Sequence, residues 1–299
     1  MTIVNRIKNI TRNTSFTEDN QPTSVKLELT GICSLQCRFC YNSTMKKHGI
    51  RQKIMSLETF KNVFHEITLV NSINEIGLFY MGESGLVKNL YSYFKEIKDF
   101  KTQDYFTFLT TNGLYGEEIL KAIPYIDSLK VSWNYKNQND FTFKTNRNAE
   151  HYYKIIENIK LFYEECHKYN KSLALSTVLD DDEESYNEIL DVLSNFYDEH
   201  YFIPLQSQGG FLSNGKCGVI GELKNTVKEI PCWSLFNGLY IDVDLNIRTC
   251  SYGHGKEHIL GNLQNNSLKN IINNPTHKKY KQLHLNGIIP DICRKCLTK

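Results

Sequence analysis

Three cysteines lie close together in the segment GICSLQCRFCYN, at Cys33, Cys37 and Cys40. A disulfide needs two thiols and a structural zinc site needs four ligands, so a set of three matches neither. Soft thiolates select zinc, copper(I) or iron–sulfur clusters. Three protein ligands on a four-iron cluster leave one iron with an open position, where a substrate or cosubstrate can bind, as at a catalytic zinc. A zinc site completed by a distant residue and a group of buried structural thiols are the alternatives.

Four further cysteines lie near the carboxyl end of the sequence. Cys232 and Cys250 have seventeen residues between them, and Cys293 and Cys296 form the pair in CRKC. Four thiolates suit an iron–sulfur cluster without an open position, and they suit a structural zinc ion equally. The chain has nine cysteines, and an odd number argues against a closed disulfide framework.

Four other polar residues carry weaker hypotheses. Cys166, in a predicted helix, is expected to be an inert, half-buried thiol. Cys217 is either a thiol that quenches a substrate radical or a simple loop cysteine. We expect His254 to be a solvated loop residue, with a place facing the substrate cavity as the alternative. Arg248 is expected to be an exposed hairpin residue, although it could also act as a base or bind an anion.

The segments that must position the first cysteines alternate between strand and helix. Apolar residues at a spacing of two predict strands over 24–30, 73–80, 105–111, 128–133, 172–179 and 200–207. Helical spacing predicts helices over 56–70, 86–100, 149–170 and 182–196. Such alternation is typical of a parallel β/α fold, whose sites gather at the carboxyl ends of the strands. The cysteine loop, MGESG (81–85) and TTNG (110–113) all follow predicted strands.

The last third of the chain has a different pattern. Gly, Ser and Asn dominate before Cys232, so residues 208–231 are predicted to be a linker between a barrel over 24–207 and a small domain over 232–299. Within that domain, 238–250 is predicted to be a hairpin and 267–286 one or two short helices. Residues 1–23 are predicted to be an amino-terminal extension.

Composition limits the partners. The 299 residues have a formal net charge of +2, so no general attraction to nucleic acid or to an anionic membrane is implied. The first residues lack the apolar stretch of a secretory signal, and no apolar run approaches the length of a membrane span. We therefore expect a cytoplasmic protein, in which clustered cysteines bind metal or act in catalysis.

The first cysteine set, with Phe39 just before its third member, resembles the motif of the radical S-adenosylmethionine (radical SAM) superfamily. The resemblance implies a 4Fe–4S cluster whose open iron binds the amino and carboxylate groups of SAM. It also implies that a reductant such as flavodoxin or ferredoxin supplies an electron, and that SAM is then cleaved to a 5′-deoxyadenosyl radical.

Other segments extend the resemblance across residues 24–207 and imply a partial (β/α)6 barrel. Gly82 and Glu83 are similar to the turn that holds the SAM ammonium in this family, although Met81 and Ser84 differ from it. Ser132 and Asn134 are implied ribose contacts. The segment IPLQ (203–206) resembles the strand that flanks the adenine.

The second cysteine set resembles a twitch domain, a shortened SPASM domain, with a small α+β fold and one auxiliary 4Fe–4S cluster. Its implied ligands are Cys232, Cys250, Cys293 and Cys296. Leu245 stands where the family usually has a glycine in the hairpin. A fully ligated cluster can accept the second electron when a substrate radical is oxidised.

The leading hypothesis is a radical SAM oxidoreductase. The cysteine spacing resembles that of an amino-inositol dehydrogenase, which implies a sugar or cyclitol alcohol as substrate. The second hypothesis is a maturase that crosslinks, epimerises or forms a thioether in a ribosomal precursor peptide. Such enzymes often carry a leader-binding domain, and the 23 residues before the first predicted strand favour the small molecule. A zinc protein without enzymatic activity is a third hypothesis.

Overall fold

The computed structural model describes residues 16–43, 51–179, 182–205 and 230–297. Its centre is a nine-stranded sheet in the order β6-β5-β4-β3-β2-β1-β7-β8-β9. The first six strands are parallel neighbours in sequence order, which confirms the predicted partial (β/α)6 barrel. The strands are β1 (Ser24–Leu27), β2 (Glu75–Gly77), β3 (Phe106–Thr111), β4 (Ser128–Ser132), β5 (Ser172–Leu179), β6 (Glu199–Pro204), β7 (Gly238–Ile241), β8 (Asn246–Arg248) and β9 (Ile259–Asn262).

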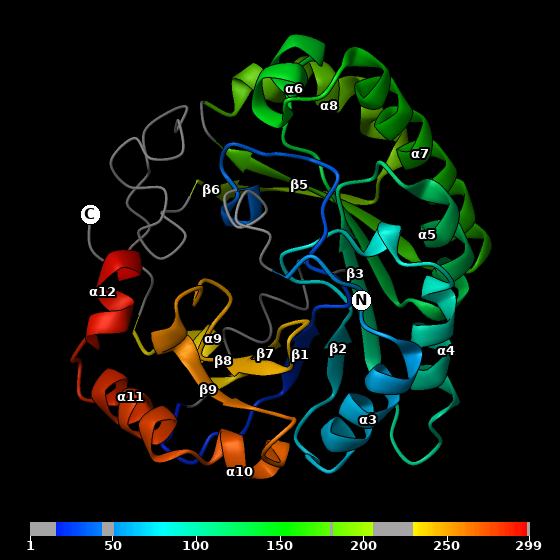
Figure 1. Ribbon diagram of the computed structural model, residues 1–299. Helices are drawn as coiled ribbons and strands as arrows, with labels where there is room; N and C mark the ends of the chain where they lie inside the picture. Colours follow the sequence, from blue (N-terminus) through cyan, green and yellow to red (C-terminus); the bar gives the residue numbers. More distant parts are fainter. Residues whose placement is uncertain (1–15, 44–50, 180–181, 206–229, 298–299) are drawn as a thin grey trace.

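The helices between the barrel strands cover one face of the sheet and form the outer rim in Figure 1. They are α3 (Leu57–Thr68), α4 (Leu90–Asp99), α5 (Gly116–Ala122), α6 (Gln138–Thr145), α7 (Ala149–Lys168) and α8 (Asn187–Leu193). The carboxyl-terminal part contains α9 (Trp233–Phe236), α10 (Leu268–Ile272), α11 (Pro275–Leu285) and α12 (Asp291–Leu297). Short 3-10 turns are η1 (Ser84–Leu86), η2 (Ile123–Tyr125), η3 (Glu184–Tyr186), η4 (Ser194–Phe196) and η5 (Lys256–His258).

Helix α3 shows how local sequence sets these elements. The Ser56 side chain caps its amino end by accepting a hydrogen bond from the Thr59 backbone N–H at 3.0 Å. Apolar residues at helical spacing then form one buried face, which packs into the core that the helices share with the sheet. These residues are Phe60, Val63, Phe64 and Ile67.

The strands divide their side chains between two faces, as the pleat requires. In β4, Leu129 and Val131 are buried in the core beneath the helices, whereas Lys130 and Ser132 are only partly buried and point to the opposite, inner face. That alternation decides which residues of each strand can meet a molecule bound inside the barrel.

The carboxyl-terminal hairpin continues the barrel sheet. Strand β7 pairs in parallel with β1, with Ser24 opposite Gly238, and β8 and β9 follow it as antiparallel strands. The predicted hairpin over 238–250 is confirmed, and two short helices lie within the predicted 267–286. Leu245 takes the left-handed backbone conformation (φ 67°) that glycine would favour, while the Asp242 carboxylate accepts hydrogen bonds from the backbone of Asp244 and Asn246.

Several predicted boundaries differ from the structure. The helix expected over 182–196 is interrupted: only α8 is α-helical, and 3-10 turns flank it. Strand β1 ends three residues before the predicted boundary, and 206–207 of the predicted last strand lie outside the described residues. Helices α5 and α6 had no counterpart among the predicted elements. In the described part of the chain, no helix combines the length and apolar character needed to cross a membrane.

Candidate functional site

The loop with Cys33, Cys37 and Cys40 leaves the carboxyl end of β1 and is held against α6. The backbone N–H groups of Gln36 and Arg38 donate to the carbonyls of Thr145 and Lys144 at 3.1 and 2.9 Å. The Arg38 side chain donates to a third carbonyl in the same helical turn, that of Phe143. Carbonyls in the last turn of a helix have no partner within the helix, so they are free to bind this loop. Helix α6 thus fixes the backbone between the cysteines.

The turn after β2 packs against the same loop. The Glu83 N–H donates to the Ile32 carbonyl at 2.8 Å. A Cβ atom on Gly82 would lie 1.9 Å from the Thr30 carbonyl oxygen, a distance that no side chain can occupy. Gly82 is therefore required by this close backbone approach. Its predicted contact with SAM is a separate proposal.

The buried Glu83 carboxylate joins the ends of two strands. One oxygen accepts hydrogen bonds from the Gly85 N–H at 2.9 Å and the Thr111 hydroxyl at 2.8 Å, and the other accepts from the Asn112 N–H at 2.7 Å. Burial raises the pKa of Glu83, and these hydrogen bonds oppose the rise. The carboxylate therefore organises the turn beside the cysteine loop, a role that the sequence motif did not indicate.

The three thiols influence one another. Burial raises the pKa of Cys37 well above its ordinary value, and the neighbouring Cys40 and Cys33 raise it further because their negative charges would repel. The Tyr135 hydroxyl donates to Cys37, and the Asn112 side chain lies 3.8 Å from the Cys33 sulfur. Sequence reasoning did not assign either partner, although Asn112 lies within TTNG and Tyr135 directly follows Asn134.

This donor set fits an iron–sulfur cluster. Thiolates that repel one another need a compensating cation, and metal binding supplies it. In the described residues, no three Cys, His, Asp or Glu side chains group tightly enough to hold a single metal ion. Three interacting thiols on one loop supply the soft donors that an iron–sulfur cluster requires.

The other predicted SAM contacts are Ser132, Asn134 and Phe39, and they differ in burial and hydrogen bonding. Ser132 ends β4 on the inner face and is partly buried. Asn134 is buried, and its side-chain oxygen accepts a hydrogen bond from the Val178 N–H at 2.7 Å, so this atom links β4 to β5. Phe39 is partly exposed within the loop. The roles of all three toward SAM stay predictions.

Two cysteines of the second set lie beside β7 and β8. Cys250 lies two residues after Arg248 of β8, which pairs with Tyr240 of β7. Cys232 precedes α9 just before β7. Burial raises the pKa of Tyr240, and the nearby charges of Cys250 and Cys232 add to the rise, which places both thiols near one phenol. Cys293 lies in α12, and the Cys296 side chain is outside the described residues.

Arg248 and His254 lie in a buried network between the two cysteine loops, so the expectation that they are exposed is wrong. Arg248 pairs with the Asp242 carboxylate at 2.8 Å and donates to the Gly253 carbonyl at 2.9 Å. His254 stacks on Tyr41, the residue after Cys40, and both of its ring nitrogens are buried. Burial, with nearby positive charges, lowers the pKa of His254 to about 3, so the ring is neutral.

The remaining cysteines have separate outcomes. Cys166 is fully buried in α7, and burial raises its pKa to about 12, which makes it an inert thiol as expected, although it is not half-buried. Cys217 lies outside the described residues.

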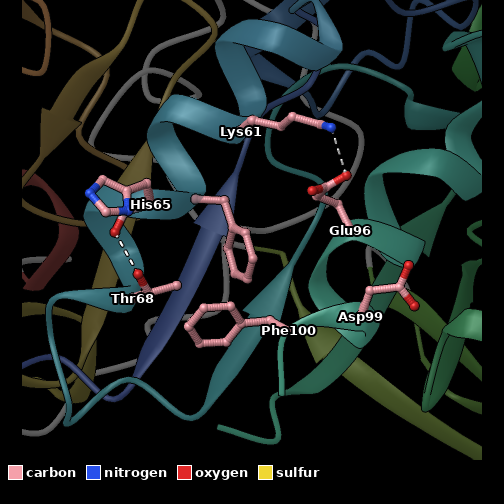
Figure 2. Close-up of a pocket in the computed structure, with 7 residues that line it drawn as sticks. Lys61, His65, Thr68, Glu96, Asp99 and Phe100 are labelled. Atoms are coloured by element: carbon pink, nitrogen blue, oxygen red, sulfur yellow. Dashed lines mark hydrogen bonds and ion pairs between the residues drawn. The ribbon is translucent and has the colours of Figure 1, made fainter. Parts of the chain in front are cut away.

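Figure 2 shows a pocket between α3 and α4. A 3.1 Å ion pair between Lys61 and Glu96 spans it. None of the predicted site residues contributes to its lining. The lining consists of Lys61, Phe64, His65, Thr68, Glu96, Asp99 and Phe100.

Two protein-family models match the chain. The model of the radical SAM superfamily matches residues 27–193, and that of the SPASM iron–sulfur cluster-binding domain matches residues 232–297. These domains imply a SAM-binding 4Fe–4S cluster and an auxiliary cluster. A comparison with curated proteins finds no significant match.

Solved structures with the same fold include three that hold different ligands. BtrN in complex with AdoMet and 2-DOIA has a TM-score of 0.59 at 13% identity, with 94% of each chain covered. SuiB from Streptococcus suis bound to the precursor peptide SuiA has a TM-score of 0.68 at 12% identity, covering 93% of this chain and 69% of SuiB. Native anSMEcpe with AdoMet and the Cp18Cys peptide has a TM-score of 0.65 at 14% identity, covering 92% and 86%.

Proposed function

Because this chain belongs to the radical SAM superfamily and carries a SPASM domain, we propose that it oxidises a small sugar- or cyclitol-type molecule. In this proposal a hydrogen atom leaves an unactivated C–H bond of the substrate, and a proton and a second electron leave afterwards. The products are a dehydrogenated molecule and 5′-deoxyadenosine.

Each cysteine set has its own role. Cys33, Cys37 and Cys40 would hold the cluster that binds SAM, and the second set would hold the auxiliary cluster. When bound, SAM and its cluster supply a hydrogen-abstracting radical, and the auxiliary cluster supplies an electron acceptor. The residues of the second set are Cys232, Cys250, Cys293 and Cys296.

The protein residues around the first set place and enclose SAM. Helix α6 and the Gly82 turn hold the cysteine loop, while Glu83 holds the ends of β2 and β3 together. We propose that Gly82 and Glu83 form the turn that receives the SAM ammonium, with Ser132 and Asn134 at the ribose. Phe39 is proposed to pack beside SAM.

The arrangement of the two sets carries the proposal of an oxidation. A three-thiol set follows the carboxyl end of β1, and cysteines of the second set lie near the amino end of its neighbour β7. In this proposal the radical forms at the first set, and the electron acceptor lies beside β7. A substrate that must lose two electrons in separate steps needs both.

The likeness to BtrN supports a small-molecule substrate. BtrN was solved with 2-DOIA, and the two chains cover each other to 94%. A peptide substrate is the second candidate, because SuiB with its precursor peptide has the higher TM-score of 0.68 and anSMEcpe also binds a peptide. In both cases a low-potential protein such as flavodoxin or ferredoxin is the proposed electron donor.

The test uses anaerobically reconstituted enzyme, SAM, a reductant and two sets of probes. One set contains aminocyclitols and sugars deuterated at carbon, beginning with 2-DOIA. The other contains short peptides encoded beside the gene, also deuterated at carbon. We expect deuterium in 5′-deoxyadenosine and one 5′-deoxyadenosine per oxidised small molecule. Turnover confined to a peptide would replace the first candidate by the second, and a lack of deuterium transfer from every probe would contradict both.

A further inference from the structure

Among the described residues, one lysine projects into the barrel without an acidic partner. Lys130 lies in the middle of β4, where Leu129 and Val131 on either side point into the core beneath the helices. Its side chain therefore points to the inner face, and its amine lies 5.7 Å from the centre of the Tyr201 ring on β6. Lys130 was not among the residues predicted from the sequence. Its only signal there was a charge at an inward position of a predicted strand.

The fully buried cations nearby in the described residues have the acceptors that burial normally demands. Lys144 is 1% exposed and forms an ion pair with Asp140 at 2.9 Å, with a hydrogen bond to the Asn134 carbonyl at 3.0 Å. Arg248 pairs with Asp242. In the described part of the chain, Lys130 has neither a hydrogen bond nor an ion pair, and its contact is the face of an aromatic ring. A stabilising role alone does not account for such a side chain.

The groups that face Lys130 in the described residues do not form an ion pair with its ammonium. On β3 its neighbour in register is Thr110 and on β5 it is Ala174, neither of which titrates. On β6 the inward residues are Tyr201, whose pKa burial raises, and Glu199, which forms no ion pair with Lys130. Burial lowers the pKa of Lys130 to about 8, because the charged ammonium loses its hydration. With this pKa, roughly a tenth of the amine is unprotonated at pH 7, against less than about a thousandth for an ordinary lysine.

The register places Lys130 beneath the cysteine loop. Asn112, whose side chain lies 3.8 Å from the Cys33 sulfur, follows Thr110 by two residues, and Thr110 pairs with Lys130. Two residues along a strand span about 7 Å. Lys130 thus lies one inward position along the sheet from Asn112, the residue beside Cys33. A substrate bound inside the barrel next to the cysteine loop would reach it.

We propose that the Lys130 amine is a catalytic residue that accepts the proton released by the substrate during its oxidation. This inference rests on the proposed function, in which the hydrogen atom and the second electron already have acceptors. Lys130 takes only the proton: the O–H or N–H bond beside the reacting carbon breaks, its electron pair stays on the substrate, and an N–H bond forms on Nζ. The ammonium then returns the proton to solvent.

The first experiment does not depend on the substrate. Holoenzyme is trace-labelled with acetic anhydride between pH 6 and 11, and labelling at each lysine is followed by mass spectrometry. We expect half-maximal reactivity of Lys130 near pH 8, against about 10.4 for an ordinary lysine. Reactivity in the ordinary range, or no labelling of Lys130 at any pH, overturns the proposal.

The second experiment separates hydrogen abstraction from proton removal, using the deuterated probe that the wild-type enzyme oxidises. Lys130→Gln should still move deuterium into 5′-deoxyadenosine, while oxidised product falls about 100-fold or more. Lys130→Arg keeps the charge and the contact with Tyr201 but cannot accept a proton, so it should not restore product. The control is Lys160→Gln on α7, where the ammonium lies 5.1 Å from the Phe196 ring on the outer side.

The outcomes distinguish the two proposals. Wild-type product formation in Lys130→Gln, or its recovery in Lys130→Arg, means that Lys130 is not the proton acceptor, while the proposed function stands. Failure of the wild-type enzyme to move deuterium from any probe contradicts the proposed function. The acetylation experiment still decides whether the pKa of Lys130 is lowered. In the wild type, product formation should rise with pH up to about 8, since only the neutral amine accepts a proton.

Discussion

The imidazole ring of His254 lies parallel to the ring of Tyr41, with centroids 3.9 Å apart and an angle of 7° between the planes. Tyr41 follows Cys40 directly, and His254 lies four residues after Cys250. The stack therefore joins the loop of the first cysteine set to the loop of the second. The buried ion pair between Arg248 and Asp242 supports the loop that follows Cys250, because Arg248 also donates to the Gly253 carbonyl in that loop.

The stack should contribute measurably to stability. In a double-mutant cycle with Tyr41→Leu and His254→Leu, we expect a coupling free energy of about 0.5–1.5 kcal/mol from urea unfolding. Tyr41→Phe keeps the ring and is the control, with coupling to His254 largely retained. Additive losses in the two leucine variants would show that the rings lie together without stabilising each other.

Replacing Glu83 should loosen the turn beside the cysteine loop. Glu83→Gln exchanges one acceptor oxygen for an amide that faces donors, so a buried N–H or hydroxyl loses its partner. We expect a loss of about 1–3 kcal/mol in the free energy of unfolding and weaker SAM binding by equilibrium dialysis. Thr111→Val removes one of the three hydrogen bonds to the carboxylate, together with the acceptor of the Gly113 N–H, and should have a smaller effect on SAM binding. An equal or larger effect in that control would argue against the carboxylate as the organising group.

Gly82→Ala adds only one methyl group, but it should strongly disturb the first cysteine set. The added Cβ would lie 1.9 Å from the Thr30 carbonyl oxygen, so the turn must separate from the cysteine loop. We expect reduced iron incorporation at the first set and loss of SAM binding. The control is Gly287→Ala, where φ is 72° but no atom lies within 4 Å, so the cost should be confined to about 1–2 kcal/mol of backbone strain. Normal SAM binding by Gly82→Ala would show that the close approach is dispensable.

Much of the barrel could be predicted from sequence because its signals are local. The Ser56 cap and the apolar face of α3 are encoded within a few turns, and alternation marks β3, β4 and β5. Helix α6 was missed because its segment, QNDFTFKT, has almost no apolar stripe and makes its contribution through carbonyls at its end. Its role became visible only when the cysteine loop was placed against it.

The environment of the site depended on contacts distant in sequence. His254 and Arg248 were expected to be exposed because no neighbouring residue in the sequence indicates their contacts. These contacts are the ring of Tyr41 for His254 and the Asp242 carboxylate for Arg248. The parallel pairing of β1 with β7 joins segments more than two hundred residues apart, which no local pattern encodes. The cysteines could be recognised without such information, since their spacing alone defines each set.

Acid should destabilise the barrel through His200. This residue lies on β6, its ring nitrogen is 2.9 Å from the Thr177 hydroxyl, and burial lowers its pKa from 6.5 to about 4. Above pH 6.5 the ring is neutral in both states and contributes no pH dependence. Between pH 6.5 and about 4 the unfolded chain binds a proton that the folded chain does not, so the free energy of unfolding falls as pH falls.

The measurement is urea unfolding at several pH values in the wild type and in His200→Gln, which keeps a hydrogen-bonding group toward Thr177. The variant should show a shallower fall between pH 6.5 and 5 and little difference in slope above pH 7. Identical curves would assign the acid sensitivity to other groups.

The central claim is that one chain holds a cluster that cleaves SAM and a second, fully ligated cluster. Its most direct test is the iron content of anaerobically reconstituted protein, measured together with 5′-deoxyadenosine release. The wild type should hold about eight irons, Cys37→Ala about four irons with no 5′-deoxyadenosine, and Cys250→Ala fewer than eight with SAM cleavage retained. Zinc in place of iron, or iron content unchanged by both substitutions, would contradict the account.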